Sequence, residues 1–284
     1  MEAMQIKFFC PRWGFEHIPW QQFLADVKAA GYAGIEWYPF GEETDYAEVL
    51  KWLQHYQLEF SIVMTVYNAP VDAEAYFIDL EQQLLQLCGI RNKQLVPLFI
   101  SAQTGREYFT AAQIERCLGI CKQVHLQTQV PVYQETHRNK WSYAAHAVYP
   151  VLQQHKDLPL TFDVSHWFCV SESYLEDQQP AVELAIQHAR HIHARVGHIE
   201  GPQVFDPALP EYTHALEQHL NIWDKWIAQR KQNGDAYCTI TPEFGPPPYM
   251  VVGNRQEKQH EIQWRINLWM KSFLEKRYKE VCGL

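Results

Sequence analysis

Four side chains able to bind a metal ion lie at the ends of successive short apolar runs. Glu135 follows VPVYQ, Asp163 follows LPLTF, His193 lies within HIHAR, and Glu243 follows CTITP. If these runs are parallel strands of one barrel, their C-terminal ends open at one mouth and the four side chains converge there. Three carboxylates and one imidazole suit Mn²⁺, Mg²⁺ or Co²⁺, with Zn²⁺ as a further candidate. The sequence therefore predicts one bound divalent metal ion.

A second interpretation exists for each of these residues taken alone. An Asp or Glu at the end of a strand often caps the following helix or meets solvent. Four such residues in succession make coincidence a weaker explanation than a shared site. A carboxylate that ends a buried apolar strand is also costly unless it is paired, hydrogen-bonded or bound to a metal ion. Asp163 in LPLTFD and Glu243 in TPEFG therefore require a partner.

The elements that would position these residues follow an alternating pattern. Short apolar runs rich in β-formers alternate with longer stretches of helical periodicity, as in βαβ units around a parallel sheet. We predict strands at residues 5–10, 34–38, 59–65, 94–100, 130–135, 160–163, 191–195 and 237–243, and helices at residues 20–30, 73–88, 111–127 and 257–279. Eight strands predict an α/β fold, a (β/α)₈ TIM barrel, with residues 1–284 as a single domain.

Composition narrows the classes of partner. The net charge of −9 provides no basic surface for a nucleic-acid backbone, so we expect no nucleic-acid partner. No apolar run approaches the roughly 20 residues that a membrane helix needs, and the first residues lack the pattern of a signal peptide. We therefore expect a cytoplasmic protein without a membrane segment. Seven scattered cysteines without a C-x-x-C pair favour neither a disulfide framework nor a thiolate zinc site.

The ordered set of motifs resembles one known family. GIEWY, QETH, FDVSH, HIHARVG and TPEFGPPP follow one another in the order found in xylose isomerase-like TIM barrels. That group contains sugar isomerases, ketose 3-epimerases, inosose dehydratases and endonuclease IV. The resemblance covers nearly the whole chain. It implies that Glu135, Asp163, His193 and Glu243 are the shared metal ligands and that His166 contacts a substrate oxygen.

The resemblance also implies a reaction. A metal ion that polarises a carbonyl and an adjacent hydroxyl acidifies the C–H bond between them, so that an enediolate can form. Glu135 and Glu243 are then the two catalytic carboxylates that remove and return the proton. The outcome is isomerisation or epimerisation of a sugar, a sugar phosphate or a related polyol. Loss of a β-hydroxyl would instead make the protein a dehydratase of the inosose type.

One position departs from the ketose 3-epimerases in this group. They carry an arginine six residues after the histidine of the seventh strand, and Ile199 stands there in this chain. A different arginine, Arg195, follows His193 by two residues and so shares its face of the strand. Arg195 could bind substrate oxygens or a carboxylate, or form a salt bridge at the mouth.

Three further residues are candidates for substrate binding at the mouth. They are Glu36 in GIEWY, His137 just after Glu135, and Trp167, whose flat face could cover a sugar ring. Each has a structural alternative: Glu36 could anchor the barrel network, and any of the ten tryptophans could belong to the core.

Two other functions remain as alternatives. An endonuclease IV-like phosphodiesterase would need extra histidines on earlier strands, and SIVMTVYN and VPLFIS lack them. A non-catalytic sugar-binding barrel would have no need of both Glu135 and Glu243. For the favoured enzyme, and equally for a sugar-binding barrel, the partner expected is a small polyhydroxylated molecule. The aromatic residues of the last predicted helix could also hold a homo-oligomer together.

Overall fold

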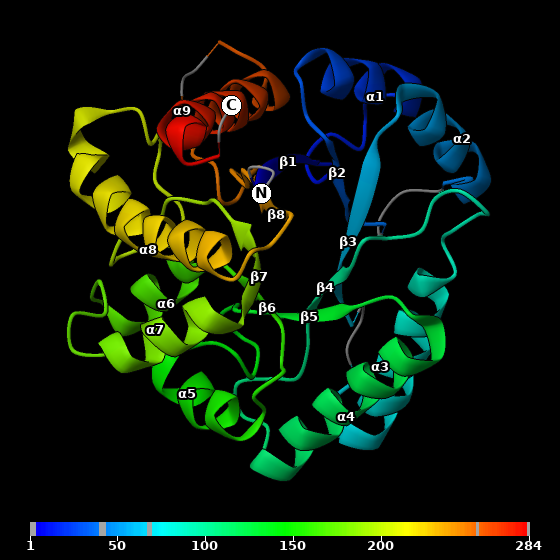
Figure 1. Ribbon diagram of the computed structural model, residues 1–284, viewed down its shortest axis with the longest axis vertical. Helices are drawn as coiled ribbons and strands as arrows, with labels where there is room; N and C mark the ends of the chain where they lie inside the picture. Colours follow the sequence, from blue (N-terminus) through cyan, green and yellow to red (C-terminus); the bar gives the residue numbers. More distant parts are fainter. Residues whose placement is uncertain (1–3, 40–43, 67–69, 254–255, 283–284) are drawn as a thin grey trace.

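The computed structural model is a closed barrel of parallel strands surrounded by helices (Figure 1). It describes residues 4–39, 44–66, 70–253 and 256–282. Each strand pairs with the next along the chain, and β8 closes the ring against β1. The strands are β1 (Gln5–Pro11), β2 (Gly34–Trp37), β3 (Glu59–Thr65), β4 (Ile100–Gln103), β5 (Val132–Glu135), β6 (Leu160–Phe162), β7 (Ala189–His193) and β8 (Tyr237–Thr241). The predicted (β/α)₈ fold is confirmed.

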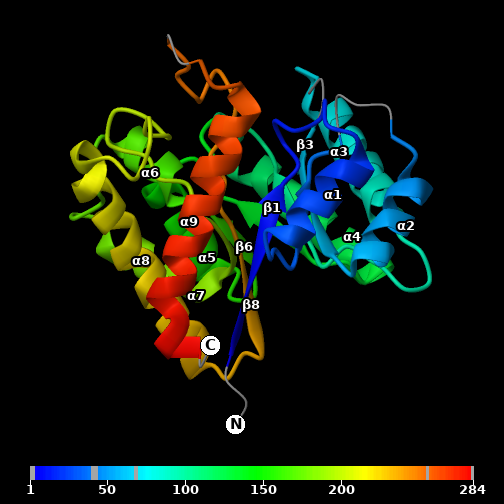
Figure 2. The same cartoon turned by 90° about the horizontal axis from the view of Figure 1, so that it is seen from above.

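Helices pack around the outside of the barrel, and the last helix lies alongside β1 (Figure 2). They are α1 (Trp20–Ala29), α2 (Tyr46–Tyr56), α3 (Ala73–Cys88), α4 (Ala111–Thr128), α5 (Ala145–Gln154), α6 (Val164–Ser171), α7 (Gln179–His188), the 3₁₀ turn η1 (Pro210–Tyr212), α8 (Thr213–Gln232) and α9 (Gln259–Cys282). Within the described part of the chain, none of them has the length and apolar character that a membrane crossing needs.

Local signals in the sequence explain where several helices begin. The side chain of Asp72 accepts a hydrogen bond from the backbone N–H of Ala75 and so caps α3. Thr110 and Gln113 form a reciprocal capping box at the start of α4. Aliphatic and aromatic side chains between these helices and the strands form one large buried cluster. The cluster fixes the strands, and thereby the residues at their C-terminal ends.

The predicted position of the fourth strand is wrong. We expect a strand at residues 94–100, whereas β4 spans Ile100–Gln103. The apolar run that suggested the earlier position contains Pro97, which has no N–H for a sheet. The strand in the structure has the sequence ISAQ. It lacks an apolar pattern because two of its four residues, Ser101 and Gln103, are polar and donate hydrogen bonds to Glu135 at the mouth.

The last two strands are shorter at the mouth than predicted. β7 begins and ends two residues earlier than expected, at Ala189 and His193, and β8 ends at Thr241. Pro242 follows β8 and cannot donate to the sheet. Arg195 and Glu243 therefore lie on the loops that leave the barrel and not within its strands.

Candidate metal and substrate site

The four predicted metal ligands come from the ends of four neighbouring strands. Glu135 and His193 are the last residues of β5 and β7, Asp163 follows β6, and Glu243 follows β8 by two residues. Candidate ligand atoms of Asp163, His193 and Glu243 lie within 4.8 Å of one another. Glu135 Oε1 lies 3.8 Å from His193 Nδ1. All four side chains are buried, so the expected convergence is present.

Two of these residues owe their position to more than the barrel. Asp163 is the N-cap of α6, because its Oδ1 accepts hydrogen bonds from the backbone N–H and the hydroxyl of Ser165. Oδ2 is left facing the site. Glu243 is held through its neighbour Phe244, whose backbone N–H and C=O both bond to Asn267 on α9. The capping role and the candidate metal role of Asp163 therefore use different oxygens.

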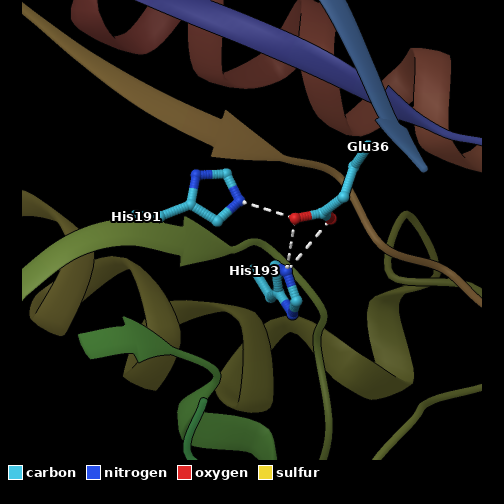
Figure 3. A group of neighbouring side chains, drawn as sticks. All are labelled: Glu36, His191 and His193. Carbon is cyan, nitrogen blue, oxygen red and sulfur yellow. Dashed lines mark hydrogen bonds and ion pairs between the residues drawn. The ribbon is translucent and has the colours of Figure 1, made fainter. Parts of the chain in front are cut away.

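His193 is oriented by Glu36, as Figure 3 shows. The Nε2 atom of His193 lies 3.0 and 3.1 Å from the two carboxylate oxygens of Glu36. His191 also approaches Glu36, at 3.3 Å, and its ring bonds to Thr239 and Thr241. An Nε2–H donated to Glu36 leaves Nδ1 to face the carboxylates of Glu243 and Glu135. Glu36 thus supports a ligand and also lines the cavity described below.

Arg195 links two of the candidate ligands. Its Nε donates to Asp163 Oδ2 at 3.0 Å, and its Nη2 donates to Glu243 Oε2 at 2.6 Å. The guanidinium is only 3% exposed, so both ion pairs are shielded from water. Of the two readings of Arg195 in the sequence, the structure contains the salt bridge at the mouth.

Glu135 is held differently, by neutral donors. Ser101 Oγ donates to Oε2 at 3.0 Å, and Gln103 Nε2 donates to Oε1 at 2.8 Å. Burial, together with the neighbouring carboxylates Glu243 and Asp163, raises the pKa of Glu135 to about 8 against the opposing effect of His193. A carboxylate in this position therefore requires a nearby positive charge to be ionised at neutral pH.

The other charged groups of the site also indicate that an additional positive charge would be stabilising there. Burial lowers the pKa of His193, but the carboxylates of Glu243, Glu36 and Glu135 outweigh it and hold that pKa well above its usual value. Burial raises the pKa of Asp163, although Arg195 opposes the change. One guanidinium and a positive charge favoured at His193 thus face four buried carboxylates, and a cation bound at Nδ1 would take the place of the proton there.

The donor atoms fit a divalent cation. His193 Nδ1 is fully buried and lies at an ion-pair distance of 3.0 Å from Glu243 Oε2, but no partner among the described residues has good hydrogen-bond geometry to it. His166 Nε2, 3.7 Å from Asp163 Oδ2, is also buried without a hydrogen-bond partner among the described residues, but Arg138 donates to Nδ1 of this ring, so Nε2 carries the proton and can serve a substrate oxygen and not a metal ion. Unsatisfied buried nitrogens beside carboxylates are costly unless something else binds them. Oxygen and imidazole ligands in this combination suit Mn²⁺, Mg²⁺, Co²⁺ or Zn²⁺.

The two other histidines of the mouth lie face to face. The rings of His137 and His166 have centroids 4.0 Å apart. Arg138 Nη1 donates to His166 Nδ1 at 3.0 Å, so the proton of His166 belongs on Nε2, which points toward Asp163. Burial lowers the pKa of both histidines, that of His137 to about 3. Both rings are therefore neutral.

A cavity of about 190 Å³ opens at the mouth beside these residues. This volume lies below the usual range for drug-sized ligands and fits a small molecule. Its walls combine charged groups from the predicted site with aromatic and neutral polar residues. The lining residues are Pro11, Trp13, Glu36, Tyr38, Val63, Thr65, Gln103, His137, Arg195, Glu243 and Tyr249.

Trp167 lies elsewhere and not at the mouth, where we expected it. Its side chain is fully buried, and its ring packs at 5.1 Å against Phe162. Its Nε1 donates to the backbone oxygen of Ser142 at 2.9 Å. Trp167 follows the ligand-bearing turn directly, but at this point of α6 a large apolar side chain points into the core.

Sequence reasoning missed several residues of the cavity wall. Trp13 and Tyr249 form an edge-to-face pair there, and Arg195 lies over the Tyr249 ring at 4.8 Å. Gln103 was missed because the fourth strand was predicted to end at residue 100, three residues before it. Arg138 and Lys140 follow Glu135 in the polar stretch THRNK, and that run of cations after a strand end was the available signal.

Comparisons with known proteins find similarity in structure only. No protein-family model and no curated protein matches the sequence. The IOLI protein solved with a bound zinc atom superposes with a TM-score of 0.62 at 12% identity, over 99% of this chain and 100% of that one. A xylose isomerase domain-containing protein from Salmonella typhimurium gives 0.60 at 16% identity, over 96% and 99%. The chain has the xylose isomerase-like TIM-barrel fold.

Other proteins with this fold have varied activities. D-psicose 3-epimerase from Clostridium cellulolyticum, solved with D-tagatose, gives a TM-score of 0.58 at 11% identity, over 94% of this chain and 97% of that one. Solved structures with similar TM-scores also include a probable dehydratase, an endonuclease IV and a xylose isomerase-like barrel in complex with magnesium. The resemblance seen in the motifs is confirmed for the fold.

Proposed function

We propose that this protein is a divalent-metal-dependent enzyme that isomerises or epimerises a small polyhydroxylated substrate. The observation that carries the proposal is the approach of two buried carboxylates, Glu243 and Glu135, to the unbonded Nδ1 of His193. Glu243 lines a cavity of small-molecule size, and the donors that hold Glu135 include Gln103 from the same wall. Epimerases among the proteins of the same fold support this class of reaction.

Four residues would hold the cation: Glu135, Asp163, His193 and Glu243. When bound, it would polarise the carbonyl and the neighbouring hydroxyl of the substrate and acidify the C–H bond between them. Glu36 keeps Nδ1 of His193 directed at the site through its contact with Nε2. Arg195 holds one oxygen each of Asp163 and Glu243, so these carboxylates keep a fixed orientation.

The two glutamates would move the proton. Glu135, held by Ser101 and Gln103, and Glu243, held by Arg195, are attached to different strands, so they can face a bound substrate from two sides. One carboxylate would take the proton from carbon, and either would return it, to the same carbon or to its neighbour. The protonated Nε2 of His166 would donate to a substrate oxygen. A substrate with a β-hydroxyl could be dehydrated by the same first step.

Exchange of substrate hydrogen with solvent tests the proposal directly. Protein loaded with Mn²⁺, Mg²⁺, Co²⁺ or Zn²⁺ would be incubated in D₂O with ketoses, aldoses and keto-inositols, and exchange at carbon followed by NMR. We expect one ion per chain by elemental analysis and deuterium uptake next to the carbonyl of at least one compound. Three zinc ions per chain with cleavage of abasic DNA would support the endonuclease-like alternative. Metal binding without exchange would support a sugar-binding barrel.

A further inference from the structure

A buried lysine stands beside the candidate site without an acidic partner. Lys140 lies on the loop between β5 and α5 and is only 8% exposed. Its Nζ donates one hydrogen bond, of 2.6 Å, to Thr65 Oγ1 at the end of β3. An ammonium group has three N–H donors, and two of them have no acceptor among the described residues. No carboxylate in that part of the chain lies within ion-pair distance of it.

The surroundings of Lys140 add positive charge to this position. Burial and the nearby Arg106 together lower the pKa of Lys140 to about 8, against smaller opposing effects of Glu135 and Glu107. Among the described residues, Arg106 donates to Asn139 Oδ1 alone, at 3.3 Å, and its buried Nε has no partner there. Two neighbouring cations with free donors are unfavourable unless an anion binds between or beside them.

Lys140 lies next to the cavity, directly behind one of its lining residues. Thr65, its hydrogen-bond partner, lines the same cavity as Glu243 and Arg195. A second cation of the loop, Arg138, contacts the neutral ring of His166 and lies 4.8 Å from the Tyr249 ring, another lining residue. The β5–α5 loop therefore places two positive charges, on Arg138 and Lys140, beside a cavity that the carboxylates of Glu36 and Glu243 line.

We propose that the substrate is a small hydroxy-oxo carboxylate, and that its carboxylate binds Lys140 Nζ and Thr65 Oγ1 while its hydroxy-carbonyl end lies at the four acidic and imidazole ligands. The assignment of the reacting end rests on the proposed function, whereas the anion site rests on Lys140 alone. The two oxygens of a carboxylate match one ammonium and one hydroxyl donor. A phosphate offers three oxygens, and the described residues of this wall include no glycine-rich loop of backbone donors for them.

Binding of an unreactive acid tests the anion site separately from the reaction. Metal-loaded protein would be titrated calorimetrically with D-gluconate and with D-glucitol, which has CH₂OH in place of the carboxylate. We expect gluconate to bind about 10–100-fold more tightly, the range for hydrogen bonds to a charged group. Lys140→Met should remove this preference, Thr65→Val should weaken it, and Lys140→Arg should restore part of it. Lys51→Met, at an exposed lysine of α2, is the matched control.

The outcomes of this titration are distinct. Equal affinity for gluconate and glucitol, or a preference that survives in Lys140→Met, would overturn the anion site. If Lys140→Met fails to fold, as judged by circular dichroism, the Thr65→Val and Lys140→Arg variants decide the question. Gluconate bound only through the metal ion would show the same affinity in every Lys140 variant, and that result also counts against the proposal.

Deuterium exchange with three matched ketoses then tests the substrate class. D-Fructose, D-fructose 6-phosphate and D-fructuronate differ at C6, as alcohol, phosphate ester and carboxylate. We expect D-fructuronate to exchange with a kcat/KM at least about tenfold higher than that of D-fructose, and Lys140→Met to abolish the difference mainly through KM. Preference for the phosphate or for the neutral sugar would overturn the carboxylate class. No exchange with any of the three, together with Lys140-dependent gluconate binding, would count against the reaction but not against the anion site.

Discussion

The two ends of the barrel differ in how their charges are balanced. At the N-terminal end, Lys7 on β1 meets Glu59 on β3 at 2.7 Å, and Arg230 meets Asp235 before β8 at 2.5 Å. At the mouth, two carboxylates of the predicted ligand set, Asp163 and Glu243, share one guanidinium, that of Arg195, and the third, Glu135, is held by the neutral donors Ser101 and Gln103. On the loop that follows Glu135, Lys140 has no acidic partner among the described residues. The ion pairs of the N-terminal end match one cation with one carboxylate, whereas at the mouth carboxylates outnumber their cationic partners and Lys140 is left without a carboxylate among the described residues.

This difference matches the division of labour in barrels of this kind. Residues at the N-terminal end serve stability, and residues at the C-terminal ends of the strands serve chemistry. A paired charge lowers the energy of the folded chain by itself. A charge without a partner lowers it only when a ligand of opposite sign arrives, which agrees with the proposals of a cation on one side of the mouth and an anion on the other.

The largest effect should come from neutralising a mouth carboxylate. Glu135→Gln and Glu243→Gln keep the shape of the side chain but remove its ability to accept a proton from carbon. We expect either change to reduce solvent exchange of substrate hydrogen by about 10²–10⁴-fold, the range for loss of an acid–base group. NMR in D₂O with metal-loaded protein measures the rate.

The matched control is Glu59→Gln at the opposite end of the barrel, which should leave the rate unchanged. Exchange at the normal rate in either mouth variant would exclude that glutamate from proton transfer. Equal losses in the control would instead indicate a general effect on the fold.

A substitution at Glu36 should weaken metal binding without changing any of the four candidate ligands. Glu36→Gln would remove the charge that orients His193 through Nε2, at 3.0 Å. Loss of such a supporting carboxylate typically costs 10–100-fold in metal affinity. Competition for the ion with a coloured chelator measures the affinity. Unchanged affinity in Glu36→Gln would show that the barrel alone orients His193, and that the contact in Figure 3 has no part in metal binding.

How much of this could be predicted from sequence depended on the type of residue. The four candidate ligands were found because each follows an apolar run and a parallel barrel brings strand ends together. The prediction placed β4 too early because two of its residues, Ser101 and Gln103, are polar side chains that donate hydrogen bonds to Glu135. A strand whose composition serves a site loses the apolar pattern by which strands are recognised.

Burial explains the remaining misses. Trp167 follows FDVSH and looked able to face a substrate, but only three-dimensional packing decides which tryptophan enters the core. Lys140 was overlooked for the opposite reason, since a lysine in a polar loop is normally solvated. Its burial and its hydrogen bond to Thr65 arise only in the folded chain, because Thr65 lies 75 residues earlier in the sequence.

The pH dependence of acid binding offers a smaller and graded test of Lys140. Its folded-state pKa is lowered to about 8, mainly by burial, so the ammonium form predominates below that pH and is lost above it. Gluconate affinity should be constant up to about pH 8 and then fall by up to tenfold per unit. Calorimetry from pH 6.5 to 9.5 measures it. A profile that is flat through pH 9.5, or identical in Lys140→Met, contradicts the assignment.

The smallest effect should come from breaking a pair at the N-terminal end. Lys7→Met removes an ion pair with Glu59 and a cation–π contact with Tyr237 at 4.3 Å. Lys7 and Glu59 are 16% and 36% exposed, so solvent screens the pair and we expect a loss of at most about 1 kcal/mol in unfolding free energy. Urea denaturation measures this, while metal content and exchange rate should stay at wild-type values. A fall in either of these would show that the two ends of the barrel are coupled, because a pair that only stabilises the fold cannot change the chemistry at the mouth.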